Sequence, residues 1–144
     1  MAIRNIVKVG DEILRKVCRT QMSFDDKLAD LLDDMAETMY KAEGVGLAAP
    51  QVGILRRICV VDVGDGLIEL INPVITKKSG TQIGSEGCLS VPNRFEEVKR
   101  PMRVTVKAQN RKGENIEINA EGFKARAFCH EIDHLDGKLF IDRV

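Results

Sequence analysis

The chain contains two histidines, His130 and His134, which bracket the segment His-Glu-Ile-Asp-His. On an α-helix, residues four apart lie on one face with Cβ atoms about 6 Å apart, so both imidazoles can reach a single ion. Glu131 is turned to the side of that pair, where a carboxylate can accept a proton. The spacing therefore predicts a metal-binding helix with a general acid/base beside the ligands.

A catalytic site of this kind uses three protein ligands and leaves one position for water, so a third ligand must come from elsewhere. Cys129 points about 100° around the helix from the neighbouring histidine and is badly placed to bind the same ion. Cys18 and Cys59 have apolar neighbours, which favours buried hydrophobic positions for both. Cys88 directly follows a glycine, whose backbone freedom allows a thiolate and nearby N–H groups to approach an ion or substrate.

A third segment, residues 44–51, reads Gly-Val-Gly-Leu-Ala-Ala-Pro-Gln and is rich in small side chains. Taken alone, a glycine turn after a helix is typical of a helix C-terminus. It is not followed by the Lys-Ser/Thr pair that a phosphate-binding loop requires. Its significance depends on the other two segments.

Together these segments resemble the three motifs of the peptide deformylases. Residues 44–51 fit Gly-x-Gly-x-Ala-Ala-x-Gln, residues 86–90 read Glu-Gly-Cys-Leu-Ser, and residues 130–134 fit the histidine motif. Their order and separation also match, and the similarity extends over essentially the whole chain. The family removes the formyl group from the N-terminal formylmethionine of newly synthesised polypeptides and releases formate.

The resemblance assigns roles to individual residues. It implies three metal ligands: Cys88, His130 and His134. It also implies that Glu131 handles the proton, and that the Gln51 side-chain amide and the Leu89 N–H bind the carbonyl oxygen. Glu86 and Asp133 are expected to fix the loop and orient the ligands, as second-sphere carboxylates do.

A methionine pocket beside the metal is also implied. Val45 and Gly46 of the first motif, and Phe123 and Ala127 of the second expected helix, are the residues available to line it. Phe123 and Ala127 precede His130 by seven and three positions, which places both on roughly its face of the helix. The alternative is that Phe123 and Ala127 simply pack in the core.

The resemblance implies one divalent metal ion, foremost Fe²⁺. Zn²⁺, Ni²⁺ and Co²⁺ also suit two imidazoles and a thiolate. The implied partners are N-formylmethionyl nascent peptides. Contact with the ribosome is expected to be transient, because the chain ends at Val144 without the basic extension that some members use. At Cys129 the family commonly has glutamine, so a thiol is expected close to the site.

Two other classes of metal protein share part of this pattern. A small zinc endopeptidase also carries His-Glu-x-x-His, but the sequence offers neither a further histidine nor a downstream glutamate helix as its third ligand. A structural zinc site of two cysteines and two histidines requires a close pair of cysteines, which the sequence lacks. The deformylase interpretation is favoured over both.

Composition indicates where the protein acts. Lys plus Arg and Asp plus Glu number 22 each, so no net charge attracts nucleic acid or a membrane surface. We expect a cytoplasmic protein, since the sequence shows neither a signal peptide nor an apolar run of about 18 residues. Four widely separated cysteines without an export signal predict reduced thiols.

The elements that must position the site follow from hydrophobic periodicity. An amphipathic helix is predicted from an N-cap at Ser23 to Gly44, and a short helical turn at residues 11–16. Two hairpins are predicted, one joining strands 58–63 and 67–71, the other joining strands near 104–108 and 116–120. A second helix is predicted from about Gly122 to Leu135.

We therefore expect a single domain over residues 1–144. Its class is α+β, with antiparallel strands and hairpins packed around a central metal-binding helix and an amphipathic helix near the N-terminus.

Overall fold

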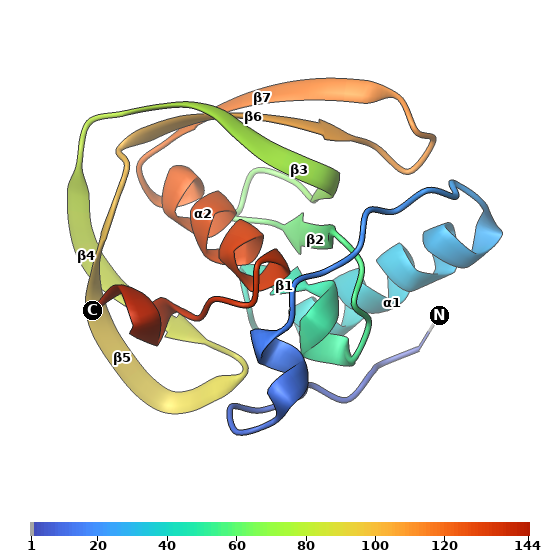
Figure 1. Ribbon diagram of the computed structural model, residues 1–144, viewed down its shortest axis with the longest axis horizontal. Helices are drawn as coiled ribbons and strands as arrows, with labels where there is room; N and C mark the ends of the chain where they lie inside the picture. The colour runs from blue at the N-terminus through green and yellow to red at the C-terminus, as the bar shows by residue number, and fades with distance from the viewer. Residues whose placement is uncertain (1) are drawn as a thin grey trace.

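The computed structural model of the chain describes residues 2–144 and has the predicted α+β architecture (Figure 1). Its helical elements are η1 (Glu12–Arg15), α1 (Asp26–Lys41), η2 (Ala49–Val52), α2 (Phe123–Leu135) and η3 (Phe140–Arg143). Its strands are β1 (Gly46–Ala48), β2 (Ile58–Val61), β3 (Ile68–Ser79), β4 (Gln82–Cys88), β5 (Val91–Arg100), β6 (Arg103–Gln109) and β7 (Asn115–Glu121).

Two antiparallel sheets surround helix α2. Five strands form one sheet in the order β1-β2-β3-β6-β7, and β4 pairs with β5 in a separate ribbon. In Figure 1, α2 lies in the centre of the molecule, with β3, β6 and β7 above it and the β4-β5 ribbon below and to the left. Helix α2 contacts β1, β2 and β7 of the large sheet as well as β5 of the ribbon. The expectation of a central helix is confirmed.

Helix α1 buries one apolar face against the large sheet. Leu28, Leu32, Met35 and Met39 are buried in a cluster with β1 and β2 side chains. The predicted N-cap at Ser23 is wrong. The cap is Asp25, which has an extended backbone and a carboxylate that accepts from the Leu28 N–H at 3.1 Å. A carboxylate at that position also complements the helix dipole, which a serine does not.

Both predicted hairpins are present, since β2 pairs with β3 and β6 with β7. The strands of the β4-β5 ribbon were not predicted. Residues 91–100 place six exposed side chains on the ribbon and carry no regular alternation of apolar and polar types. A ribbon of this kind lacks the period-two pattern that reveals a half-buried strand.

Helix α2 is buried from Ala125 to Leu135. Its side chain Phe128 is fully buried in the cluster between the helix and the large sheet. The helix starts after Gly122, whose φ of +64° suits glycine and allows the chain to turn from β7 into the core. The fold thus buries helix α2, and the polar residues of this helix must form their hydrogen bonds and ion pairs within the interior.

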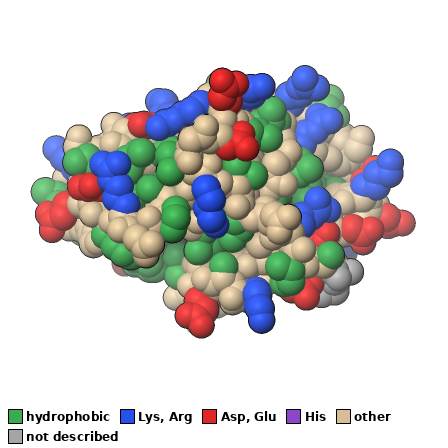
Figure 2. Space-filling view, turned by 90° about the horizontal axis from the view of Figure 1, so that it is seen from below, with side chains coloured by type: hydrophobic (Ala, Val, Ile, Leu, Met, Phe, Trp, Pro, Cys, Tyr) green, Lys and Arg blue, Asp and Glu red, His purple; other side chains and the backbone are tan. Residues whose placement is uncertain are grey.

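On the surface, charges of both signs are mixed. Figure 2 shows Lys and Arg side chains interspersed with Asp and Glu on one face, and no histidine reaches that face. None of the helices within residues 2–144 is long and apolar enough to span a membrane.

Candidate metal centre

Three potential ligand atoms meet where the end of β4 faces helix α2. Those of Cys88, His130 and His134 all lie within 4.8 Å of one another. The Cys88 Sγ is 3.3 Å from His134 Nε2, and the two imidazole centroids are 5.1 Å apart. A thiolate and two imidazoles at these separations form a donor set that suits a divalent transition metal.

The second nitrogen of each imidazole has a distinct environment. His130 Nδ1 donates to Glu86 Oε1 at 3.0 Å, which directs Nε2 toward the other ligands. Histidine ligands commonly have such a carboxylate partner, because it fixes the tautomer and the ring orientation. His134 Nδ1 is buried and has no partner among residues 2–144, while its Nε2 faces Cys88. Both rings are thus arranged with Nε2 toward the space between the three side chains.

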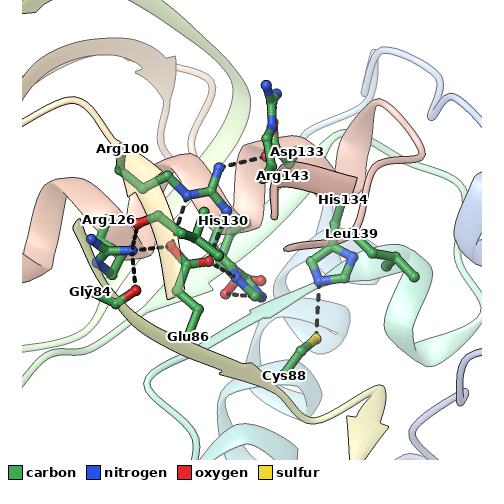
Figure 3. A network of polar contacts seen from close by, with 12 residues as sticks. Gly84, Glu86, Cys88, Arg100, Arg126, His130, Asp133, His134, Leu139 and Arg143 are labelled. Carbon is green, nitrogen blue, oxygen red and sulfur yellow. Dashed lines mark hydrogen bonds and ion pairs between the residues drawn. The ribbon is translucent and has the colours of Figure 1, made fainter. Parts of the chain in front are cut away.

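Glu86 is held by two buried arginines (Figure 3). Arg100 donates to both Glu86 oxygens at 2.8 Å, and Arg126 donates to Glu86 Oε2 at 2.6 Å. Burial alone would raise the pKa of Glu86, but the hydrogen bonds from Arg100 and His130 hold it well below its usual range. Glu86 is therefore a fixed anion behind the His130 ring.

The network continues to the end of the chain. Arg100 also donates to Asp133 at 2.7 Å, and Arg143 of η3 donates to both oxygens of the same carboxylate at 3.0 and 2.9 Å. Asp133 therefore lies between two guanidinium groups, on the turn of α2 that separates the histidines. These ion pairs fix the position of the helix turn that carries the ligands.

Glu131 occupies a different environment from Glu86. Its side chain is buried, and its Oε1 has no hydrogen-bond partner among residues 2–144. Burial raises the pKa of Glu131 to about 7, against the attraction of the His130 ring. Gly46 of β1 packs directly on this carboxylate, since a Cβ at that position would overlap it. Glu131 can therefore exchange a proton near neutral pH.

The two imidazoles have opposite electrostatic environments. Burial opposes protonation of His130, but the charge of Glu131 and the hydrogen bonds with Cys88 and Glu86 outweigh it and raise the pKa of this ring. Burial and the neighbouring His130 hold the pKa of His134 well below its usual range, so this imidazole is neutral. Surrounding negative charge that attracts a proton also attracts a metal ion.

Gln51 and Leu89 lie at the rim of the same site. The Gln51 side chain accepts from the Ala48 N–H at 2.9 Å and donates to Ser90 Oγ at 3.1 Å, and its Nε2 is 3.5 Å from Cys88 Sγ. The Leu89 N–H donates to no acceptor among residues 2–144. Two donors are thus present beside the thiol.

A cavity of about 590 Å³ opens onto these groups. Val45, Gly46, Phe123 and Ala127 all line it, together with Glu131 and His130. Ala127 also belongs to the core cluster, whereas Phe123 is 56% exposed, so the alternative that Phe123 packs in the core is wrong. A larger hollow of about 840 Å³ lies over β3, β6 and β7, but it contains none of the candidate ligands.

The other three cysteines are not among the converging ligand atoms. Cys18, Cys59 and Cys129 are buried in the cluster between α2 and the large sheet, whereas Cys88 contacts a different cluster. Burial raises the pKa of Cys18 to about 11, raises that of Cys59 well above its usual range, and also raises that of Cys129. Both Cys18 and Cys59 are thus buried thiols, as predicted. Cys129 is absent from the ligand cluster, as the helix geometry predicts, and it lines a hollow together with Arg100 and Asp133, so the expected thiol lies beside the ion pairs that support the site.

Sequence reasoning missed three residues that support the site: Ser90, Arg100 and Arg126. Ser90 is fully buried and receives the Gln51 amide. Arg126 precedes His130 by four positions, so helical spacing alone could have placed it on the same face. Arg100 lies at the end of β5, and its role depends on a ribbon that the sequence pattern does not reveal.

Comparison with known proteins places this geometry in context. The model of the family described as polypeptide deformylase matches residues 3–144. A peptide deformylase from Acetivibrio thermocellus is 60% identical to this chain over its whole length, and the match covers 85% of that relative. A peptide deformylase from Caldicellulosiruptor bescii is 57% identical over the whole chain, and the match covers 87% of that relative. The crystal structure of peptide deformylase from Thermotoga maritima is similar with a TM-score of 0.97 at 48% identity, covering 99% of this chain and 97% of that one.

Proposed function

The chain belongs to the polypeptide deformylase family, and from that membership we propose which of its residues carry out the reaction. The protein is a metal-dependent hydrolase that removes the N-formyl group from newly synthesised polypeptides. The proposed metal ligands are Cys88, His130 and His134. The observation that carries this assignment is the convergence of their ligand atoms within 4.8 Å, beside a buried carboxylate.

Glu131 is the proposed general acid/base. When bound, the metal ion would lower the pKa of a water molecule from about 15.7 toward 7 and polarise the formyl carbonyl. Glu131 accepts a proton from the attacking water and then donates it to the departing amine nitrogen. Its pKa of about 7 supports both transfers near neutral pH, because the carboxylate and the carboxylic acid are then similarly populated. The products are formate and a free N-terminus.

The negative charge that develops on the formyl oxygen requires donors that are in place beforehand. We assign this role to the Gln51 side-chain amide and the Leu89 N–H. Two hydrogen bonds support the role of Gln51: its side chain accepts from the Ala48 N–H and donates to Ser90 Oγ, which fixes the amide next to Cys88. Loss of one donor of this kind typically reduces the rate about 10²- to 10³-fold.

The cavity lined by Val45, Gly46, Phe123 and Ala127 is the proposed binding site for the methionine side chain. An unbranched thioether fits an apolar pocket of irregular shape. Its burial is worth roughly 1.5–3 kcal/mol, which corresponds to about ten- to a hundredfold preference over alanine.

We further propose Fe²⁺ as the physiological metal, with Zn²⁺, Ni²⁺ and Co²⁺ as alternatives that the same donors would bind. The proposed location is the cytoplasm, where bacterial relatives would meet formylated nascent chains. Contact with the ribosome is proposed to be transient, because the balanced charge of the chain provides no strong attraction to RNA.

The experiment that tests this function compares substrates on metal-loaded protein. Formyl-Met-Ala should be deformylated, whereas a peptide with only internal amide bonds should remain intact. Cleavage of the internal bond instead would support the endopeptidase alternative. A chain that binds metal but leaves both peptides intact would support a structural metal site.

The pocket assignment has its own test. Formyl-Met-Ala should be processed about ten- to a hundredfold more efficiently than formyl-Ala-Ala, with formyl-Leu-Ala between them. Ala127→Phe should reduce this preference, because the larger ring fills the cavity beside the ligands. If the three peptides react equally, or if Ala127→Phe leaves the preference unchanged, the methionine does not bind here.

A further inference from the structure

Residues 2–9, which we call the N-terminal strap, are hydrogen-bonded to both segments that carry the proposed oxyanion donors. The Val7 N–H donates to the Gln51 carbonyl oxygen, and the Val9 N–H donates to the Ser90 carbonyl oxygen, each at 2.7 Å. Both distances are at the short end of the range for N–H···O bonds. The two donors are only two residues apart in the chain, so one short segment of the strap connects both carbonyls.

The two carbonyls belong to residues that are also joined through their side chains. The Gln51 amide donates to Ser90 Oγ at 3.1 Å, and both residues are almost completely buried. The strap bonds and this side-chain bond therefore close a ring that runs from Gln51 through the strap to Ser90 and back. A third contact lies outside the ring, where Lys8 Nζ donates to the Leu89 carbonyl oxygen at 3.3 Å.

The strap itself is held in place from the opposite side. The Ala2 N–H donates to Asp34 of α1 at 2.7 Å, and the Arg4 N–H donates to Thr38 Oγ1 at 2.9 Å. The Arg4 guanidinium also pairs with Asp34 at 2.9 Å. Val7 packs on the apolar cluster that contains Val91 and Phe140. The position of the strap is thus set by helix α1 and by the core rather than by the site it contacts.

We propose that the N-terminal strap is a positioning element for the hydrolysis: through the Val7 and Val9 N–H groups it fixes the separation between the Gln51 amide and the Leu89 N–H. This inference rests on the oxyanion roles proposed for those two residues. The strap touches no reacting atom. Its effect arises because preorganised donors stabilise a developing charge only when they are already at hydrogen-bonding distance.

Removal of a single N–H from the full chain tests this proposal. Synthetic residues 1–17 can be joined to expressed residues 18–144 by ligation at the native Cys18. One product carries an ester in place of the Val7 amide, which removes the donor and keeps the side chain. The control carries an ester at Ile6, whose N–H has no acceptor within residues 2–144.

The Val7 ester should lower kcat for formyl-Met-Ala about tenfold, less than the loss of a whole donor, at unchanged metal content. The kcat of the Ile6 ester should stay within about twofold of that of the all-amide ligated protein, because this ester removes no hydrogen bond. If the Val7 ester also stays within that limit, the strap does not position the donors. An all-amide ligated protein without deformylase activity would instead contradict the proposed function.

Comparing the Val7 ester with the all-amide protein again, now in the Gln51→Ala background, separates positioning of the Gln51 amide from a purely structural contribution of the strap. Once the amide is absent, its position no longer matters, so the Val7 ester should change kcat by less than about twofold there. An equal loss in both backgrounds would show that the ester acts independently of Gln51 and would overturn the proposal.

Discussion

Two buried carboxylates beside the ligand atoms differ in what surrounds them. Glu86 accepts hydrogen bonds from Arg100, Arg126 and His130, whereas Glu131 has a buried oxygen without a partner among residues 2–144. Their pKa values accordingly move in opposite directions, that of Glu86 well below its usual range and that of Glu131 up to about 7. Pairs of titratable groups separated in this way often divide the roles of fixed charge and proton carrier.

Glu131→Gln is therefore expected to separate metal binding from turnover. The amide has nearly the same shape, so the metal content should equal that of the unmodified protein. It cannot accept a proton, so kcat should fall by about 10²- to 10⁴-fold. Metal analysis and a deformylation assay on the same preparation check this expectation. A variant that retains more than about a tenth of the activity would count against Glu131 as the base.

Glu86→Gln should act on the metal rather than on the proton transfer. The amide no longer balances the buried charges of Arg100 and Arg126 and is a weaker acceptor for His130. Metal affinity should fall about 10- to 100-fold, as is usual when a second-sphere partner is changed. Competition with a chelator measures this affinity. Glu97→Gln, on the exposed face of the same ribbon, is the control and should leave it unchanged.

Residue types and spacing indicated the proposed ligand set, because the two histidines lie one helical turn apart and Cys88 is the one cysteine that follows a glycine. The arginines behind Glu86 were not predicted. An arginine in a sequence is ordinarily solvent-exposed, and only the three-dimensional proximity of Arg100 and Arg126 to a buried carboxylate explains their burial.

At the scale of elements, the helices and the two hairpins were predictable because each has a period and a terminating signal. The β4-β5 ribbon was not, although it carries Cys88, Glu86 and Arg100. Its side chains are mostly exposed, so the hydrophobic alternation that identifies a strand is missing. The first motif likewise forms a short strand, β1, followed by η2, where the sequence indicated only a helix terminus.

The stability of the fold should depend on how α2 packs against the large sheet. Phe128 is fully buried in that contact, so Phe128→Ala should lower the free energy of unfolding by about 3–5 kcal/mol. Phe123 lies on the same helix but is 56% exposed, so Phe123→Ala should change the free energy of unfolding by no more than about 0.5 kcal/mol. Denaturant unfolding of both variants tests this difference. Equal losses would mean that α2 is not held by the cluster around Phe128.

At the scale of the whole molecule, three distant segments form one site because helix α2 lies between the large sheet and the ribbon. Residues 44–51 approach it from the sheet side, and residues 86–90 from the ribbon side. The sequence could indicate that these segments act together through the family resemblance. It could not indicate which elements bring them together, since that depends on the packing of both sheets on one helix.

The central claim is that Cys88, and not the neighbouring Cys129, joins His130 and His134 to hold the catalytic metal. The most direct test measures metal stoichiometry and formyl-Met-Ala deformylation of anaerobically prepared Cys88→Ala and Cys129→Ala proteins. We predict that Cys88→Ala loses both the metal and the activity, while Cys129→Ala retains about one ion per chain and most of its turnover. Full metal content and activity in Cys88→Ala, or their loss only in Cys129→Ala, would contradict the account.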